Sequence, residues 1–208
     1  MITSDTFIVS KAGYKFLFLS LVLFIVFTLF GWDFLKFLSL IALLLFVYIY
    51  RNPEREIPHL QKGAILSPVD GIVVAINTVD SGYEVVVKSS LFDSSILRSP
   101  FFSTVKSVHT RNGARLSADI RKSMLLNEKV GIDFEDNNKH IIHVEHISDN
   151  AIDNIKINLH NEYEISQGKR YGVMTKGKTV IRFPHACRLS LHVGDQLRAG
   201  ESLLGYIS

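Results

Sequence analysis

The stretch that decides the fold is FLFLSLVLFIVFTLFGWDFLKFLSLIALLLFVYIY (residues 16–50), in which only Asp33 and Lys36 are charged. As one helix it would extend about 52 Å at about 1.5 Å per residue, beyond a hydrocarbon core of about 30 Å. Gly31, Trp32, Asp33 and Lys36 gather near its middle, where a turn at a membrane interface would place them. The sequence therefore predicts two short transmembrane helices, over residues 16–32 and 34–50, joined by a tight turn.

Basic residues flank both ends of this predicted helix pair. Lys11 and Lys15 precede the first helix, and Arg51 and Arg55 follow the second. The positive-inside rule then puts both ends in the cytoplasm. We expect residues 1–15 to form a cytoplasmic tail and the remainder of the chain to face the cytoplasm from the inner membrane.

Two other interpretations compete with a membrane hairpin. A signal peptide has an apolar run of about 7–15 residues followed by a small-residue cleavage site, whereas the first run here is longer and ends at Trp32 and Asp33. A buried hairpin of a soluble protein would have a polar face. Residues 16–30 offer only Ser20 and Thr28 for one.

The composition excludes several classes of protein. The chain has 208 residues, of which 47% are hydrophobic and 21% charged, and this balance excludes a disordered chain. A single cysteine, Cys187, cannot form an internal disulfide and fits a reducing compartment, where we expect it to be a small core residue. The net charge of +3 is small and dispersed, so we expect no nucleic-acid partner.

Beyond Tyr50 the pattern changes to that of an all-β domain, residues 51–208. A connector broken by Pro53 and Pro58 comes first, and short runs rich in Val and Ile then alternate with Gly, Asp, Asn and Ser clusters. A helix is expected only over Ser89–Leu97. The predicted strands are Gly71–Asn77, Tyr83–Lys88, Lys139–Glu145, Ile155–Leu159, Thr179–Phe183, Arg188–Val193 and Ser202–Ile207.

A series of short motifs, each weak alone, becomes specific through its order and spacing. The motifs are Arg51-Asn52-Pro53-Glu54-Arg55 with Ile57-Pro58, Ser67-Pro68-Val69-Asp70-Gly71, Val108-His109, Asn127-Glu128, Gly168-Lys169-Arg170-Tyr171-Gly172 leading to Gly177, Val193-Gly194-Asp195 and Ala199-Gly200-Glu201. Together they resemble the phosphatidylserine decarboxylase family, in its short, membrane-anchored bacterial and archaeal branch. The resemblance implies a barrel-like all-β fold with a barrel-sandwich-like C-terminal part.

The resemblance also implies a self-processing chemistry. In this family a serine after a glycine attacks its own preceding carbonyl, activated by an aspartate and a histidine, and ends as a pyruvoyl group. The pyruvoyl carbonyl forms a Schiff base with the substrate amine and accepts electrons as CO₂ leaves. By position, Asp70 matches the aspartate and His109 matches the histidine.

The serine itself is missing. Where the family has Gly-Ser, this chain has Gly177-Lys178-Thr179. Lysine has no oxygen on Cβ, so we expect no pyruvoyl group and no other cofactor. Thr179 carries a hydroxyl, but strand alternation aims it away from Asp70 and His109. The segments at residues 102–107, 110–113 and 146–150 also depart from the family pattern, which puts the substrate pocket in doubt.

Three further patterns have ordinary explanations. His140, His143 and His146 could suggest a metal site, but the surrounding Ile and Val predict a strand that separates them onto two faces. Residues 191–201 resemble the end of a biotinyl or lipoyl carrier, yet the tip around Lys178 lacks the flanking methionines of a carrier. A basic rim for anionic headgroups, or merely a solvated face, could form from Arg51, Arg55, Lys62, Arg111, Arg115, Arg121 and Lys122.

The sequence thus predicts a membrane-anchored homologue of phospholipid metabolism that binds a phosphatidylserine-like lipid or a protein partner without processing itself. A homo-oligomer, or a hetero-oligomer with a serine-bearing relative, is compatible with this role. The alternative is an active enzyme that converts phosphatidylserine to phosphatidylethanolamine. Restoring serine at Lys178 is expected to restore cleavage only if Asp70 and His109 remain competent.

Overall fold

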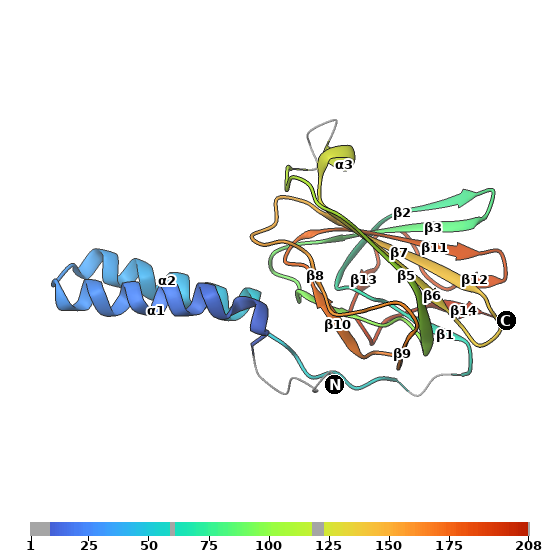
Figure 1. Cartoon of the computed structure of the whole chain (residues 1–208), viewed down its shortest axis with the longest axis horizontal. Coiled ribbons are helices and arrows are strands. Elements are labelled where there is room, and N and C mark those ends of the chain that lie inside the picture. The colour runs from blue at the N-terminus through green and yellow to red at the C-terminus, as the bar shows by residue number, and fades with distance from the viewer. Residues whose placement is uncertain (1–8, 59–60, 118–122, 208) are drawn as a thin grey trace. The chain divides into compact units, whose positions relative to one another are not determined.

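The computed structural model describes residues 9–58, 61–117 and 123–207. The chain divides into two compact units, residues 1–54 and 55–208. Helices form the first unit and strands dominate the second (Figure 1). Its elements are η1 (Lys11–Gly13), α1 (Tyr14–Leu29), α2 (Asp33–Ile49), β1 (Ala64–Leu66), β2 (Gly71–Val79), β3 (Gly82–Ser89), β4 (Ile96–Arg98), β5 (Ser103–Arg111), α3 (Ser123–Leu126), β6 (Lys129–Glu135), β7 (Ile141–Ser148), β8 (Lys156–Ile157), β9 (Tyr163–Ile165), β10 (Arg170–Val173), β11 (Gly177–Pro184), β12 (Cys187–Leu189), β13 (Gln196–Leu197) and β14 (Leu203–Ile207).

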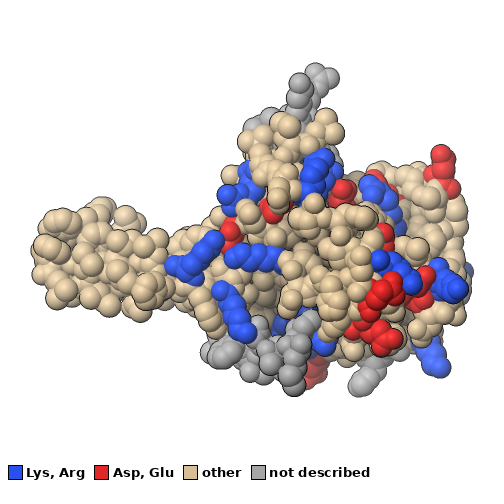
Figure 2. Space-filling view, in the orientation of Figure 1, with Lys and Arg blue, Asp and Glu red and all other residues tan. Residues whose placement is uncertain are grey.

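The first unit is a helical hairpin, as predicted. Helices α1 and α2 are joined at Phe30-Gly31-Trp32, where Gly31 has a φ of 67° that suits a residue without a Cβ. The rings of Phe16 and Phe46 stack at 5.1 Å across the pair. The segment Lys11–Leu29 is long and apolar enough to cross a membrane. In the space-filling view most of the hairpin carries no charged atoms (Figure 2).

The second unit is built on one eight-stranded sheet, which confirms the all-β prediction. Its strands are hydrogen-bonded in the order β13-β2-β3-β11-β7-β6-β5-β9, and two three-stranded sheets, β1-β14-β12 and β4-β10-β8, complete the unit. All the pairings are antiparallel. Among the described strands the ladder has two free ends, β13 and β9, so closure into a barrel is not seen.

Strand alternation gives the large sheet a buried face and an outer face. On β11, Thr179, Ile181 and Phe183 are buried in the core, so Lys178 and Arg182 point to the outer face. The core side continues through Val85 and Val87 of β3, and Cys187 is buried with this core, as predicted. The outer face is polar at many positions, as expected for an antiparallel sheet with one solvated side.

Three local predictions differ from the structure. The helix expected over Ser89–Leu97 is absent, because the hydroxyl and backbone N–H of Ser90 both donate to the Asp93 carboxylate and hold a turn before β4. The strand expected over Ile155–Leu159 shortens to β8, and the one over Arg188–Val193 ends at Leu189. By contrast, β2, β3, β7, β11 and β14 lie where the alternation placed strands.

Candidate functional site

The Gly177–Lys178 peptide lies at the start of β11, in the middle of the large sheet. Gly177 is opposite Ser89 of β3 on one side and Ser148 of β7 on the other. Lys178 is opposite Lys88 and Ile147. The Lys178 side chain therefore shares the outer face with Lys88, whereas Gly177 and Thr179 face the core.

The space around Gly177 is tightly packed. A Cβ added to Gly177 would collide with the backbone oxygen of Ile147 and would lie 2.6 Å from the Met174 sulfur. The hydroxyl of Ser148, buried directly across from Gly177, has no hydrogen-bond partner among the described residues. A side chain at position 177 would therefore force the neighbouring backbone of Ile147 or the Met174 side chain to move.

Asp70 lies close to this peptide, in a buried ion pair. Its backbone oxygen accepts a hydrogen bond from the Ser89 hydroxyl at 2.5 Å, which ties it to the strand that pairs with Gly177. Its carboxylate receives two parallel bonds from Arg55, Nη1 to Oδ1 and Nη2 to Oδ2, each 2.6 Å. Both side chains are about 90% buried.

Backbone groups complete the surroundings of the Asp70 carboxylate. The N–H of Ala199 donates to Oδ1 at 2.7 Å and the N–H of Ser94 to Oδ2 at 3.3 Å. Arg55 also donates to the Ala199 carbonyl at 2.9 Å. Each carboxylate oxygen thus accepts two hydrogen bonds, and none of these donors, taken over the described residues, is a histidine. The Asp70 carboxylate thus holds together the three segments that contain Arg55, Ser94 and Ala199.

His109 lies elsewhere, on the exposed outer face of β5. Strand register aligns it with Gly131 of β6, Glu145 of β7 and Val180 of β11. Three strand spacings of about 4.8 Å separate β5 from β11, so about 14 Å of sheet lies between His109 and the strand of Lys178. The structure does not bring Asp70, His109 and Lys178 together as a triad, and the match of Val108-His109 to the family histidine has no geometric support.

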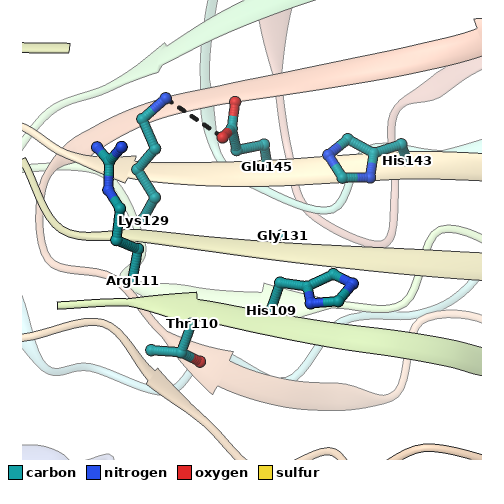
Figure 3. Close-up of a pocket in the computed structure, with 7 residues that line it drawn as sticks. All are labelled: His109, Thr110, Arg111, Lys129, Gly131, His143 and Glu145. Atoms are coloured by element: carbon teal, nitrogen blue, oxygen red, sulfur yellow. Dashed lines mark hydrogen bonds and ion pairs between the residues drawn. The ribbon is translucent and has the colours of Figure 1, made fainter. Parts of the chain in front are cut away.

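A shallow pocket of about 230 Å³ surrounds His109 instead (Figure 3). His109 and His143 stand on either side of Gly131, and Arg111 and Lys129 lie beside one another (Figure 3). The Lys129 ammonium is 3.3 Å from the Glu145 carboxylate. The lining residues are His109, Thr110, Arg111, Lys129, Gly131, His143 and Glu145; we call this the β5–β7 pocket.

The three spaced histidines also separate, as predicted. His143 Nδ1 lies 2.6 Å from Asp133 on the outer face, and hydrogen bonds from Ser107 and His143 lower the pKa of Asp133 although its burial opposes this. His146 is fully buried in the core, between the Thr179 hydroxyl at 2.9 Å and the Tyr171 hydroxyl at 2.7 Å. Burial lowers the pKa of His146 to about 3, so its ring is neutral.

The Asn127-Glu128 motif forms a buried clamp rather than a surface loop. The Asn127 side chain bonds both the N–H and the carbonyl of Leu116, and donates to the Ser148 carbonyl at 2.6 Å. Glu128 accepts from the N–H of Ile155, and burial raises its pKa. The motif therefore fixes the end of β7 beside Gly177.

Comparison with known proteins identifies the fold family of these residues. The family model described as phosphatidylserine decarboxylase matches residues 42–205. The chain belongs to the phosphatidylserine decarboxylase family. No solved structure matches it.

Relatives carry the name phosphatidylserine decarboxylase proenzyme. The one from Ehrlichia ruminantium (strain Welgevonden) is 30% identical over 185 residues, which cover 83% of this chain and 80% of the relative. The relative from Desulfotalea psychrophila is 28% identical, with 84% and 85% covered. The relative from Wolbachia of Brugia malayi is 28% identical, with 96% and 91% covered. The predicted family membership is confirmed.

The residues present do not fit the pyruvoyl group of the phosphatidylserine decarboxylase family. Lys178 has no β-oxygen from which a pyruvoyl carbonyl could form, Gly177 is packed, and the Asp70 carboxylate is bound by Arg55.

Sequence reasoning missed the role of Arg55, which it counted among residues that could form a basic rim or merely a solvated face. Arg55 is largely buried against Asp70, so it cannot belong to such a rim. Arg121 and Lys122, two other members of that rim, lie outside the described residues. Arg55 and Asp70 lie on either side of Pro58 in the sequence. Their contact is long-range, so a local hydrophobic pattern could not predict it.

Proposed function

We propose that this protein is a member of the phosphatidylserine decarboxylase family that remains one uncleaved chain and binds a lipid or protein partner without decarboxylating phosphatidylserine. The observation that carries the proposal is Lys178 at the position that the Gly177-Lys178-Thr179 pattern assigns to the processing serine. A lysine side chain cannot form the ester intermediate, and it cannot lose a β-oxygen by elimination. Its amine cannot replace a carbonyl as the group that condenses with a substrate amine.

The state of Asp70 supports the same proposal. An aspartate that orients a catalytic histidine must accept a hydrogen bond from that ring. In this chain the Asp70 carboxylate accepts four hydrogen bonds, from Arg55 twice, from Ser94 and from Ala199. The residue retained from the family motif therefore serves the stability of the domain.

One observation favours the second candidate, an active enzyme that processes itself at Thr179. The Thr179 hydroxyl lies 2.9 Å from His146 Nδ1, which is the contact a hydroxyl nucleophile needs from a base. Against it, Thr179 is fully buried between paired strands, and the low pKa of His146 makes it a weak base. We therefore favour the uncleaved protein.

The membrane is the proposed location. The apolar segment Lys11–Leu29 supports an anchor, and the neighbouring α2 supports a hairpin that crosses and returns. Basic residues at both ends of the hairpin support a cytoplasmic position at the inner membrane for the β-rich unit. A homo-oligomer, or a hetero-oligomer with a serine-bearing relative, is compatible with this location.

A lipid conversion assay tests the proposal. The purified full-length protein, reconstituted into vesicles that contain phosphatidylserine, is expected to form no phosphatidylethanolamine above protein-free vesicles. A serine-bearing member of the family, reconstituted in parallel, serves as the positive control. Formation of phosphatidylethanolamine by this chain would overturn the proposal in favour of the second candidate.

A further inference from the structure

The outer face of the large sheet carries a row of cations that crosses five strands. Hydrogen-bonded register aligns Arg111 of β5 with Lys129 of β6, Lys129 with Ile147 of β7, Ile147 with Lys178 of β11, and Lys178 with Lys88 of β3. Only Ile147 interrupts the four basic residues. This row, which we call the cationic row, begins in the β5–β7 pocket and runs past the position of the lost serine.

Much of this charge is not neutralised. Lys178 and Lys88 stand directly opposite each other and form no ion pair within the described part of the chain, an arrangement that destabilises a sheet. Glu145 forms an ion pair with one residue of the row, because its carboxylate lies 3.3 Å from the Lys129 ammonium. The same carboxylate lies 3.8 Å from the Arg182 guanidinium. Lys178 and Lys88 therefore add positive charge to the outer face, which attracts an anion to this side of the sheet.

The pocket at the start of the row is small, and most of the residues that line it are polar. Gly131 forms its floor, since any Cβ at that position would come within 3.2 Å of the His143 ring. Arg111 and Lys129 form one wall, and His109 stands beside the floor (Figure 3). A volume of about 230 Å³ is below that of pockets that enclose drug-sized ligands, about 300–1,000 Å³, and suits a headgroup rather than an acyl chain.

The chemistry of the lining selects a ligand that carries both signs of charge. The Arg111 guanidinium donates once to the Asn127 carbonyl, at 3.1 Å, and its other N–H groups are available for a phosphate. His109 and Lys129 add further donors for phosphate oxygens. Glu145 lies on β7, across the pocket from β5, and an ammonium would share its carboxylate with Lys129 at 3.3 Å and Arg182 at 3.8 Å.

Apolar residues beside the pocket favour a lipid over a soluble phosphate. Leu125 and Leu126 of α3 are 71% and 54% exposed. They directly precede Asn127, and the Asn127 carbonyl accepts a hydrogen bond from Arg111. The two leucines therefore lie near the Arg111 end of the cationic row. Exposed leucines next to arginine and lysine are typical of a surface that rests on a bilayer interface.

We infer that the β5–β7 pocket binds the headgroup of an amine-bearing phospholipid, with Arg111, His109 and Lys129 on the phosphate and Glu145 on the ammonium. The inference rests on the proposed role as a lipid-binding homologue, and it names the site and the headgroup chemistry. The site differs from the Gly177–Lys178 region, so lipid would be held without entering a reaction.

Native mass spectrometry of the full-length protein in non-ionic detergent tests the inference. The probes are dihexanoyl phosphatidylserine, dihexanoyl phosphatidylglycerol, glycerophosphoserine and inorganic phosphate. We expect Arg111→Ala to weaken phosphatidylserine binding about tenfold, the value of one charged hydrogen bond. The matched control is Arg188→Ala, which removes an exposed arginine of β12 and should leave binding unchanged.

A second variant tests the polarity of the site. Glu145→Gln should lower the preference for phosphatidylserine over phosphatidylglycerol, because it removes the partner of the ammonium, while phosphatidylglycerol binding stays or strengthens. Equal binding by Arg111→Ala and wild type, or tighter binding of inorganic phosphate than of the lipids, would overturn the inference. The intact mass of the same sample reports cleavage separately, so a failed headgroup site and a failed proposal of non-processing give different results.

Discussion

Arg55 and Asp70 form a buried, bidentate ion pair in which both hydrogen bonds measure 2.6 Å. The pair joins the connector that follows the helical hairpin to the turn before β2, and Ala199 adds a third segment through its N–H and carbonyl. In a low-dielectric interior, such a pair is costly to break because the surviving charge is left without a partner.

Arg55→Ala should therefore destabilise the β-rich unit by about 3–5 kcal/mol. Denaturant unfolding of the full-length protein in detergent measures the change. The matched control is Arg182→Ala, whose side chain is 42% exposed in its contact with Glu84 and should cost no more than about 1 kcal/mol. Equal losses of unfolding free energy in the two variants would show that the Arg55–Asp70 pair contributes no more to stability than an exposed ion pair.

Lys178→Ser tests whether a hydroxyl at position 178 is sufficient for self-cleavage. We expect this variant to fold but not to cleave itself, because Asp70 is bound by Arg55 and His109 lies three strands from β11. Gel electrophoresis after extended incubation, with thermal unfolding as the folding control, checks both points. A fragment that begins at residue 178 would mean that the surroundings are competent and that a serine hydroxyl at this position is sufficient for cleavage.

His146 should make the protein sensitive to mild acid. Burial lowers the pKa of His146 from 6.5 to about 3. Between these two pH values the imidazole is protonated in the unfolded chain but neutral in the folded protein, which favours unfolding. Its contribution to stability is complete above pH 6.5 and falls as the pH drops toward 3. In unfolding experiments between pH 7 and 4, His146→Gln should show a shallower loss of stability than wild type, and parallel curves would contradict this account.

Cys187 should be unreactive in the folded protein. Burial raises the pKa of its thiol to about 11, so little thiolate is present at neutral pH. Labelling with a maleimide should be slow in native buffer and fast in denaturant. Ser190→Cys places a second thiol at an exposed position nearby and should label quickly in both conditions; rapid native labelling of Cys187 itself would contradict its burial.

The sequence predicted the fold where the pattern was local. Two apolar runs separated by Gly31 and Trp32 were sufficient for the hairpin, and alternating Val and Ile were sufficient for β2, β3 and β11. The strand β6 was missed because Gly131 and its acidic residues weaken the β pattern, although pairing with β5 and β7 stabilises it. Here tertiary pairing overrides weak local propensity.

The site was less predictable, because it depends on register and long-range contacts. The sequence singled out Asp70 and Lys178, but it could not show that Arg55 occupies the Asp70 carboxylate. It matched His109 by its neighbour Val108, whereas only strand order shows that two strands separate β5 from β11. The cationic row depends on five strands aligning Arg111, Lys129, Lys178 and Lys88, which are scattered along the chain.

The intact mass of the purified, detergent-solubilised full-length protein tests the central claim most directly. The account predicts a single species at the full-length mass of 23.5 kDa, with an unmodified Lys178. This result would also exclude a lysine-linked carrier group. Two fragments, with the C-terminal one starting at residue 178 or 179 and bearing a carbonyl in place of its amine, would contradict the account.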